Sequence, residues 1–357
     1  MEQERIGEKT AKPSKRLAYI DVLNVIAALS VVVLHCNGCF WLGPAQGRSW
    51  ISANIIESTL YWPVSIFFMI TGVTLMGYRS RMTTKSYFGR RVSRTVVPFV
   101  AWSIFGLVWC VATAPSAGEP IDLSPLAIVE GILNTRYTGV YWFFPPLFAI
   151  YLSIPILSLL INNRRILLYV VAVGVATVFV APLVCGLLGI IWNESLVPPP
   201  VAGYVVYVVL GYLLSTQELT KRQRIVVYVL GVVGWAMQLF GTFALSSVAE
   251  GVSFTFKGYT NLPVLLQATA VFTFVRNMDF EGNGILRRVA ALCRVLSGAT
   301  FGVYLMHWYP INFFERLRAF STMSVYWRIG GALVIFVACA VLTLGIKRVP
   351  LLKRLVP

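Results

Sequence analysis

The chain has 357 residues, of which 57% are apolar and only 12% are charged, and its mean hydropathy is +0.75. A water-soluble protein of this size needs about 25% charged residues to cover its surface. This composition argues against a soluble enzyme, a disordered protein and a secreted disulfide scaffold. The formal net charge of +16 points to an anionic partner, either a nucleic acid or a membrane surface.

Ten stretches of at least 18 residues contain no Asp, Glu, Lys or Arg. A membrane-spanning segment needs about 20 mostly apolar residues, and its backbone must satisfy its own hydrogen bonds, so each stretch is predicted to be a helix. The stretches are 22–47, 58–78, 95–118, 137–163, 166–193, 195–217, 225–249, 258–275, 295–314 and 329–346. The sequence therefore predicts an all-α, polytopic membrane protein with about ten transmembrane helices.

The basic residues are distributed unevenly between the two sides of such a bundle. With ten spans, 24 of the 30 Lys and Arg lie on the side that carries both termini. Because Lys and Arg gather in cytoplasmic loops, both termini are predicted to be cytoplasmic. The predicted organisation is a cytoplasmic tail over 1–18, one transmembrane domain over 19–346 and a second cytoplasmic tail over 347–357. Most of the charge is then explained by topology and contact with anionic lipids, and no nucleic-acid partner is expected.

The only two histidines, His35 and His307, both lie inside predicted spans. Ionisable side chains at membrane depth are costly, and each is therefore a candidate for function. Counted along their helices, both imidazoles lie at similar depth toward the outer face. The alternative is that each is a hydrogen-bonded packing residue.

The first predicted helix carries a polar stripe made of Asp21, Asn24 and His35. At 100° per residue, Asn24 and His35 differ by about 20°, and Asp21 and His35 by about 40°. The stripe is about 21 Å long, so this helix could line a path through the membrane. For Asp21 the alternative is an interfacial cap at the start of the helix.

Three arginines lie directly before the third predicted helix: Arg90, Arg91 and Arg94. Arg91 and Arg94 are three residues apart, share a helix face, and carry guanidinium groups that bind phosphate through two hydrogen bonds. The alternative is ordinary anchoring by positive charge on the cytoplasmic side.

Aromatic residues, among them Tyr141 and Trp142, gather at the outer end of the fourth predicted helix. They are suited to stacking on a sugar or a lipid carrier, or to an interfacial aromatic belt. Cys36 and Cys39 form a C-x-x-C pair with no second pair, so we expect apolar packing there and no metal site.

Five motifs together resemble the acyltransferase-3 family of integral membrane O-acyltransferases, and the resemblance covers most of the chain. In chain order they are the first-helix segment 19–28 with His35, the segment 64–72 that ends in Thr71 and Gly72, the Arg91 and Arg94 pair, the aromatic segment 141–144, and the segment 302–307 with Tyr304 and His307. Asn24 stands where the family commonly has an arginine, eleven residues before the first-helix histidine, and Thr71 replaces a serine but keeps a hydroxyl.

The resemblance implies transfer of an acyl group, usually acetyl from acetyl-CoA, to a hydroxyl. Family acceptors are mostly surface polysaccharides or their lipid-linked sugar precursors, which implies a multi-pass protein of the bacterial inner (cytoplasmic) membrane. Acyl-CoA, the glycan acceptor and membrane lipids are then the partners, and no metal is required.

The same resemblance suggests roles for individual residues. His35 is the expected general base, and His307 is expected to orient the acceptor or stabilise developing charge. The phosphates of coenzyme A would bind Arg91 and Arg94, with Arg90 beside them. The substrate path would be lined by Asp21, Asn24, Thr71, Tyr141, Trp142 and Tyr304. Direct transfer and a covalent acyl-histidine relay both stay open.

Two other classes of protein fit the same composition. A transporter or flippase of a polysaccharide intermediate also needs many helices and polar residues at membrane depth, although the internal symmetry typical of transporters is not visible. A receptor or assembly subunit without chemistry is the third class.

Overall fold

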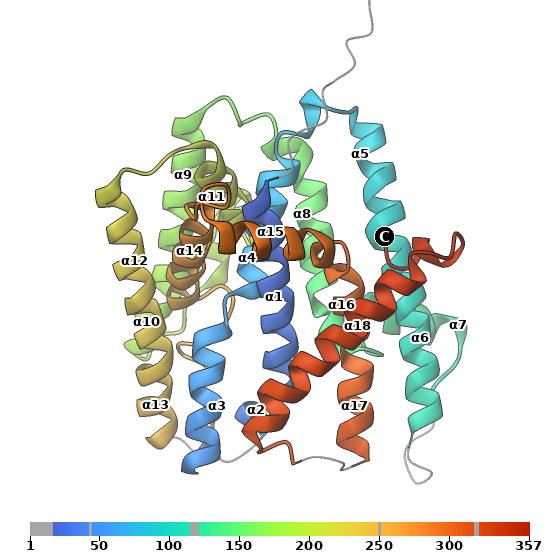
Figure 1. Ribbon diagram of the computed structural model, residues 1–357. Coiled ribbons are helices and arrows are strands. Elements are labelled where there is room, and N and C mark those ends of the chain that lie inside the picture. The colour runs from blue at the N-terminus through green and yellow to red at the C-terminus, as the bar shows by residue number, and fades with distance from the viewer. Residues whose placement is uncertain (1–16, 43–44, 115–120, 249–250, 318–320) are drawn as a thin grey trace, which may run out of the picture.

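The computed structural model of the chain describes residues 17–42, 45–114, 121–248, 251–317 and 321–357 (Figure 1). Within these ranges the regular elements are all helical and no strand occurs, which confirms the predicted all-α class. Most of the helices run side by side along one direction, as Figure 1 shows. Nearly all of the predicted N-terminal tail lies outside the described residues.

The α-helices are named in chain order. They are α1 (Ala18–Cys36), α2 (Cys39–Leu42), α3 (Gly47–Leu60), α4 (Pro63–Leu75), α5 (Thr84–Arg91), α6 (Val97–Thr113), α7 (Pro125–Leu133), α8 (Phe144–Leu157), α9 (Arg164–Gly174), α10 (Ala181–Leu187), α11 (Val205–Thr216), α12 (Lys221–Ala236), α13 (Thr242–Val248), α14 (Leu262–Arg276), α15 (Gly284–Ser297), α16 (Thr300–Met306), α17 (Trp308–Arg316) and α18 (Ala332–Ile346). Short turns of other helix types lie between or beside them: the π-helical turns η2 (Val92–Val96), η4 (Val175–Val180), η7 (Met237–Gly241) and η8 (Tyr326–Gly331), and the 3-10 turns η1 (Tyr78–Ser80), η3 (Gly139–Phe143), η5 (Glu194–Leu196), η6 (Pro199–Val201) and η9 (Leu352–Arg354).

Local sequence explains where several of these helices begin. The side chains of Thr83, Asn163 and Thr220 each accept a hydrogen bond from a backbone N–H in the first turn of α5, α9 and α12. Proline occupies the first turn of α4 and α14, where its missing N–H costs nothing.

The structure contains seven continuous helices that are long and apolar enough to cross a membrane, or eight if one bent pair forms a span, among the residues it describes. The seven are Ala18–Leu42, Gly47–Ser80, Thr84–Thr113, Gly139–Leu157, Arg164–Leu187, Lys221–Val248 and Tyr326–Ile346, and the bent pair is α15 with α16 and α17, at 53°. The predicted spans 195–217 and 258–275 form α11 and α14, which have 12 and 15 residues. A polytopic membrane protein is thus supported, while the count of ten spans and the cytoplasmic position of the termini stay predictions.

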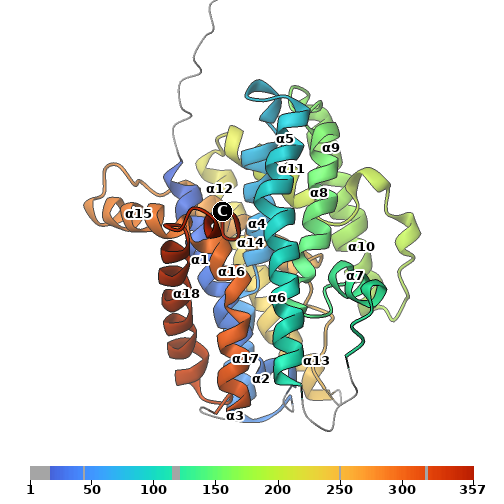
Figure 2. The same ribbon diagram turned by 90° about the vertical axis from the view of Figure 1, so that its right-hand side faces the viewer.

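Helix α1 lies in the middle of the bundle (Figures 1 and 2). It contacts α3, α4, α14, α15, α16, α17 and α18. In its most apolar window 67% of the residues are buried, whereas in Lys221–Val248 the figure is 22%. The outer helices expose aliphatic side chains such as Val229, Val232, Val337 and Val341, as expected for surfaces that face lipid tails. Polar side chains on α1 therefore face other helices rather than lipid.

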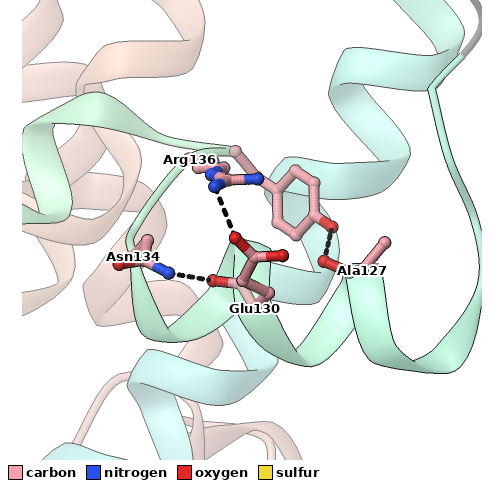
Figure 3. A network of polar contacts seen from close by, with 5 residues as sticks. Ala127, Glu130, Asn134 and Arg136 are labelled. Carbon is pink, nitrogen blue, oxygen red and sulfur yellow. Dashed lines mark hydrogen bonds and ion pairs between the residues drawn. The ribbon is translucent and has the colours of Figure 1, made fainter.

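Helix α7 and the turn that follows it pack against each other (Figure 3). The guanidinium of Arg136 pairs with the Glu130 carboxylate at 2.5 Å, and the Tyr137 hydroxyl donates to the Ala127 carbonyl at 3.1 Å. Asn134 donates from its side chain to the Glu130 carbonyl. These contacts brace the turn that leads into η3, which carries Tyr141 and Trp142.

The predicted C-terminal tail packs back onto the bundle near α6. The indole N–H of Trp102 donates to the Leu355 carbonyl at 3.0 Å, and the Val356 side chain is fully buried.

Two glycines bring α4 and α11 into backbone contact. A Cβ atom added to Gly72 would lie 1.9 Å from the Val208 carbonyl oxygen, and one added to Gly211 would lie 2.3 Å from the Met69 carbonyl oxygen. Helices in a membrane commonly pack through small residues that let their backbones approach closely. Lipid tails are as apolar as the side chains, so the hydrophobic effect does not bring the helices together there. The same contact sets the orientation of α4, and therefore the direction in which its Phe67 and Thr71 side chains point.

We expect Gly72→Ala to lower the free energy of unfolding by about 1–3 kcal/mol, because a methyl group has no room against the α11 backbone. The melting temperature of the purified protein measures the effect. Gly77→Ala is the control, since no atom lies within 4 Å of a Cβ at Gly77. Equal melting temperatures for the two variants would contradict this packing.

Candidate functional site

A cavity of about 320 Å³ lies beside α1, between α4, the α5–η2 segment, η3 with α8, and α16. It follows α1 from Asn24 to His35, which is about 16 Å along the helix axis. Seven residues singled out from the sequence line it: Asn24, His35, Thr71, Arg91, Arg94, Trp142 and Tyr304. The remaining wall is mainly apolar and aromatic, with side chains such as Val31, Val64, Phe67 and Ile70.

The two histidines meet at one end of this cavity. The Nδ1 atom of His35 lies 2.7 Å from the Nε2 atom of His307, and the two rings are stacked with centroids 4.9 Å apart. His307 is fully buried, whereas His35 is partly accessible. The sequence-based expectation of a common depth agrees with this contact.

The hydrogen bonds of His307 determine which nitrogen atoms carry protons. Its Nδ1 atom lies 2.8 Å from the Tyr304 carbonyl and 3.1 Å from the Val303 carbonyl, and a carbonyl can only accept. In a neutral imidazole the Nε2 atom of His307 is then an acceptor, so the Nδ1 atom of His35 must be the donor. The Nε2 atom of His35 is left with a free lone pair, the arrangement that a general base requires.

His307 stands at the junction of α16 and α17, where the helix is interrupted. The preceding residues hold it in place: the Tyr304 hydroxyl donates to the Val140 carbonyl, and the Tyr141 hydroxyl donates to the Leu305 carbonyl at 2.7 Å. The braced turn at η3 is thereby tied to the helix that carries the histidine.

Arg91 supplies positive charge to the cavity. Its guanidinium lies between two aromatic rings, 5.9 Å from the Tyr87 ring centre and 5.5 Å from that of Tyr151. Its Nε atom is buried without a hydrogen-bond partner, which is uncommon for a charged donor. Arg94, from the π-helical turn η2, lines the same cavity and is exposed. Two guanidinium groups beside one cavity are suited to binding an anion.

Four residues predicted for the site do not line the cavity, and one of them, His307, lies buried behind His35. Asp21 is buried at 3% exposure on the part of α1 near Cys293 of α15. Arg90 is exposed on α5, and Tyr141 is fully buried in the packing between η3 and α16. Only Asn24 and His35 of the polar stripe on α1 therefore line the cavity.

A second cavity, of about 360 Å³, lies at the α2 end of the bundle. It shares Leu34, His35, Trp142 and Tyr259 with the first cavity. His35 thus stands where two cavities from opposite ends of the bundle share a wall.

Sequence reasoning missed the acidic residue of this second cavity, Glu57. Glu57 directly precedes the charge-free run 58–78 and was therefore predicted to lie in a loop. The structure places it on α3, with only 1% of its surface exposed. Asn54 and Glu57 precede this run, and Ser58 begins it. The three polar residues recur at helical spacing, and that pattern could have extended the predicted helix toward the N-terminus.

The chain matches the family model described as an acyltransferase domain, over residues 17–344. The chain belongs to the acyltransferase-3 family. It is accordingly a membrane acyltransferase. No curated protein and no solved structure matched it.

We expect His307→Ala to lower the rate of acyl transfer about a hundredfold or more. His35 would lose the hydrogen-bond acceptor that fixes the orientation of its ring and its tautomer. His307→Gln should restore part of the rate, since a glutamine oxygen can accept from the same N–H. Initial rates in isolated membranes measure both variants. Wild-type rates in His307→Ala would show that the pair has no part in catalysis.

Proposed function

We propose that the protein moves an acyl group, with acetyl as the leading candidate, from cytoplasmic acyl-CoA to a hydroxyl of a surface polysaccharide or its lipid-linked sugar precursor, in the inner membrane of a bacterium. The observation that carries the proposal is the position of His35, hydrogen-bonded to His307 and lining both cavities. A catalytic base between two entrances suits a reaction whose substrates come from opposite sides of a membrane.

The first cavity suits the acyl-CoA donor. Arg91 and Arg94 lie on the segment that enters from the α5 end of the bundle, and phosphate groups pair well with guanidinium. From there the apolar wall along α1 would accommodate the uncharged acyl-pantetheine arm. The thioester would then reach the neighbourhood of His35.

The chemistry follows from the free Nε2 atom of His35. It takes the proton of the acceptor hydroxyl while the hydroxyl oxygen attacks the thioester carbonyl carbon. The carbon–sulfur bond breaks, and the departing thiolate takes the proton from the His35 imidazolium. His307 stabilises that imidazolium by accepting from its Nδ1–H. A covalent relay, in which the acyl group rests on His35 before it reaches the hydroxyl, would use the same nitrogen.

His35→Ala is expected to reduce O-acylation about 10²- to 10⁴-fold, because the general base is removed. Acyl groups on the surface glycan, measured by mass spectrometry in cells that carry only the variant, report the loss. Binding of coenzyme A to the purified variant serves as the control for folding. Normal glycan acylation would remove His35 from the site.

Arg91→Ala is expected to weaken coenzyme A binding about tenfold to a hundredfold, because a charge-assisted hydrogen bond to phosphate is lost. Calorimetric titration of the protein in lipid nanodiscs gives the dissociation constant. Arg164→Ala is the matched control, since Arg164 is an exposed arginine on α9 and does not line the cavity. Equal affinities in the two variants would leave Arg91 as a membrane anchor only.

A further inference from the structure

The second cavity has the lining of a sugar site. Aromatic side chains make up half of its wall, namely Trp41, Tyr61, Trp142, Tyr259 and Trp308. Ring faces carry partial negative charge and attract the slightly positive C–H groups on the face of a pyranose. Leu42, at its rim, is 91% exposed, so the cavity reaches the surface at the α2 end of the bundle.

The aromatic wall leads inward to the catalytic pair. The Tyr61 and Tyr259 rings are stacked with centres 4.7 Å apart, and Tyr259 in turn stacks on Trp142 at 5.2 Å. Trp308 meets His35 edge to face at 6.5 Å. A sugar held against these rings would present a hydroxyl toward the Nε2 atom of His35.

One carboxylate, that of Glu57, lies in this wall. One of its oxygens accepts from the Trp41 indole N–H at 3.0 Å, and the other from the Asn37 side-chain amide at 2.9 Å. An ionised carboxylate has about four lone-pair positions, so roughly two remain for a ligand. Hydroxyl groups bind carboxylates through short, strong hydrogen bonds.

Lys257 offsets the charge of Glu57. Its ammonium interacts electrostatically with Glu57, donates to the Ser58 hydroxyl at 2.7 Å, and lies over the Phe40 and Tyr61 rings. A cationic ligand would therefore meet little net negative charge in this cavity. A neutral ligand rich in hydroxyl groups matches both the rings and the carboxylate.

We propose that the second cavity is the acceptor site, that it holds a pyranose unit of the glycan, and that Glu57 selects this unit by accepting a hydrogen bond from one of its hydroxyls. This inference rests on the proposed acyl transfer and adds the location and the recognition chemistry of the acceptor. Glu57 lies in the acceptor cavity alone and does not line the cavity of Arg91 and Arg94.

The test uses the full chain in lipid nanodiscs, labelled acetyl-CoA, and surface glycan that has been deacylated with mild alkali. Glu57→Gln should raise the KM for the glycan about tenfold to a hundredfold, because a hydrogen bond to a charged acceptor is lost. The KM for acetyl-CoA should not change. Glu315→Gln is the matched control, since Glu315 is a partly buried glutamate on α17 that lines neither cavity.

A second variant protects the test against misfolding of Glu57→Gln. Leu42→Cys changes an exposed rim residue, and a bulky maleimide on that thiol should block glycan acylation while coenzyme A still binds. Val248→Cys, at a residue that is 87% exposed and outside both cavities, is the labelled control.

The possible outcomes separate the two proposals. If the unmodified protein transfers no acetyl group to the deacylated glycan, the proposed function fails and the acceptor site fails with it. If it acetylates the glycan but Glu57→Gln keeps the wild-type KM and blocked Leu42→Cys stays active, only the acceptor site is wrong. Acetyl transfer to a non-sugar acceptor in place of the glycan would overturn the pyranose assignment.

Discussion

The hydrogen bond between His35 and His307 joins residues 272 positions apart, and it constrains how the central helices can be arranged. One ring comes from the middle helix of the bundle, and the other from the junction of α16 and α17. For these rings to meet, α1 must contact α16, and the turn at η3 must hold Tyr304 and Leu305 in place. Because both carbonyls beside His307 accept from the same nitrogen, this geometry also determines the tautomer of His35.

The membrane explains why the polar residues form networks. A charged side chain in a low-dielectric interior is costly unless partners compensate it. Arg328 is fully buried and donates to the Asn37 side chain, the Ser52 hydroxyl and the Met323 carbonyl. Asn37 also donates to Glu57, so the buried arginine and the buried carboxylate belong to one network. This network holds α1, α3 and the start of the last span together beside the second cavity.

Helical periodicity predicted which candidate site residues share a face of α1. It did not predict which neighbouring helix covers each part of that face. Asn24 and His35 share a face of α1 and line one cavity, as their angular positions indicate. Asp21 shares nearly the same angle, yet α15 packs there and removes it from the cavity. Periodicity gives an angle about one axis, and it does not say which neighbour covers each turn. Tyr141 was likewise expected to line the substrate path. In the structure it is fully buried, and its hydroxyl donates to the Leu305 carbonyl of α16.

The sequence by itself determined the helical class, the membrane environment and the family, because apolar runs, the scarcity of charge and the order of short motifs are local properties of the chain. It also identified both histidines, since the chain has no others. Only the tertiary structure decided that these histidines touch, that two cavities share His35, and that Glu57 lies inside the bundle. Those facts depend on helix packing between segments far apart in sequence, where backbone contacts such as that of Gly72 with Val208 set the distances.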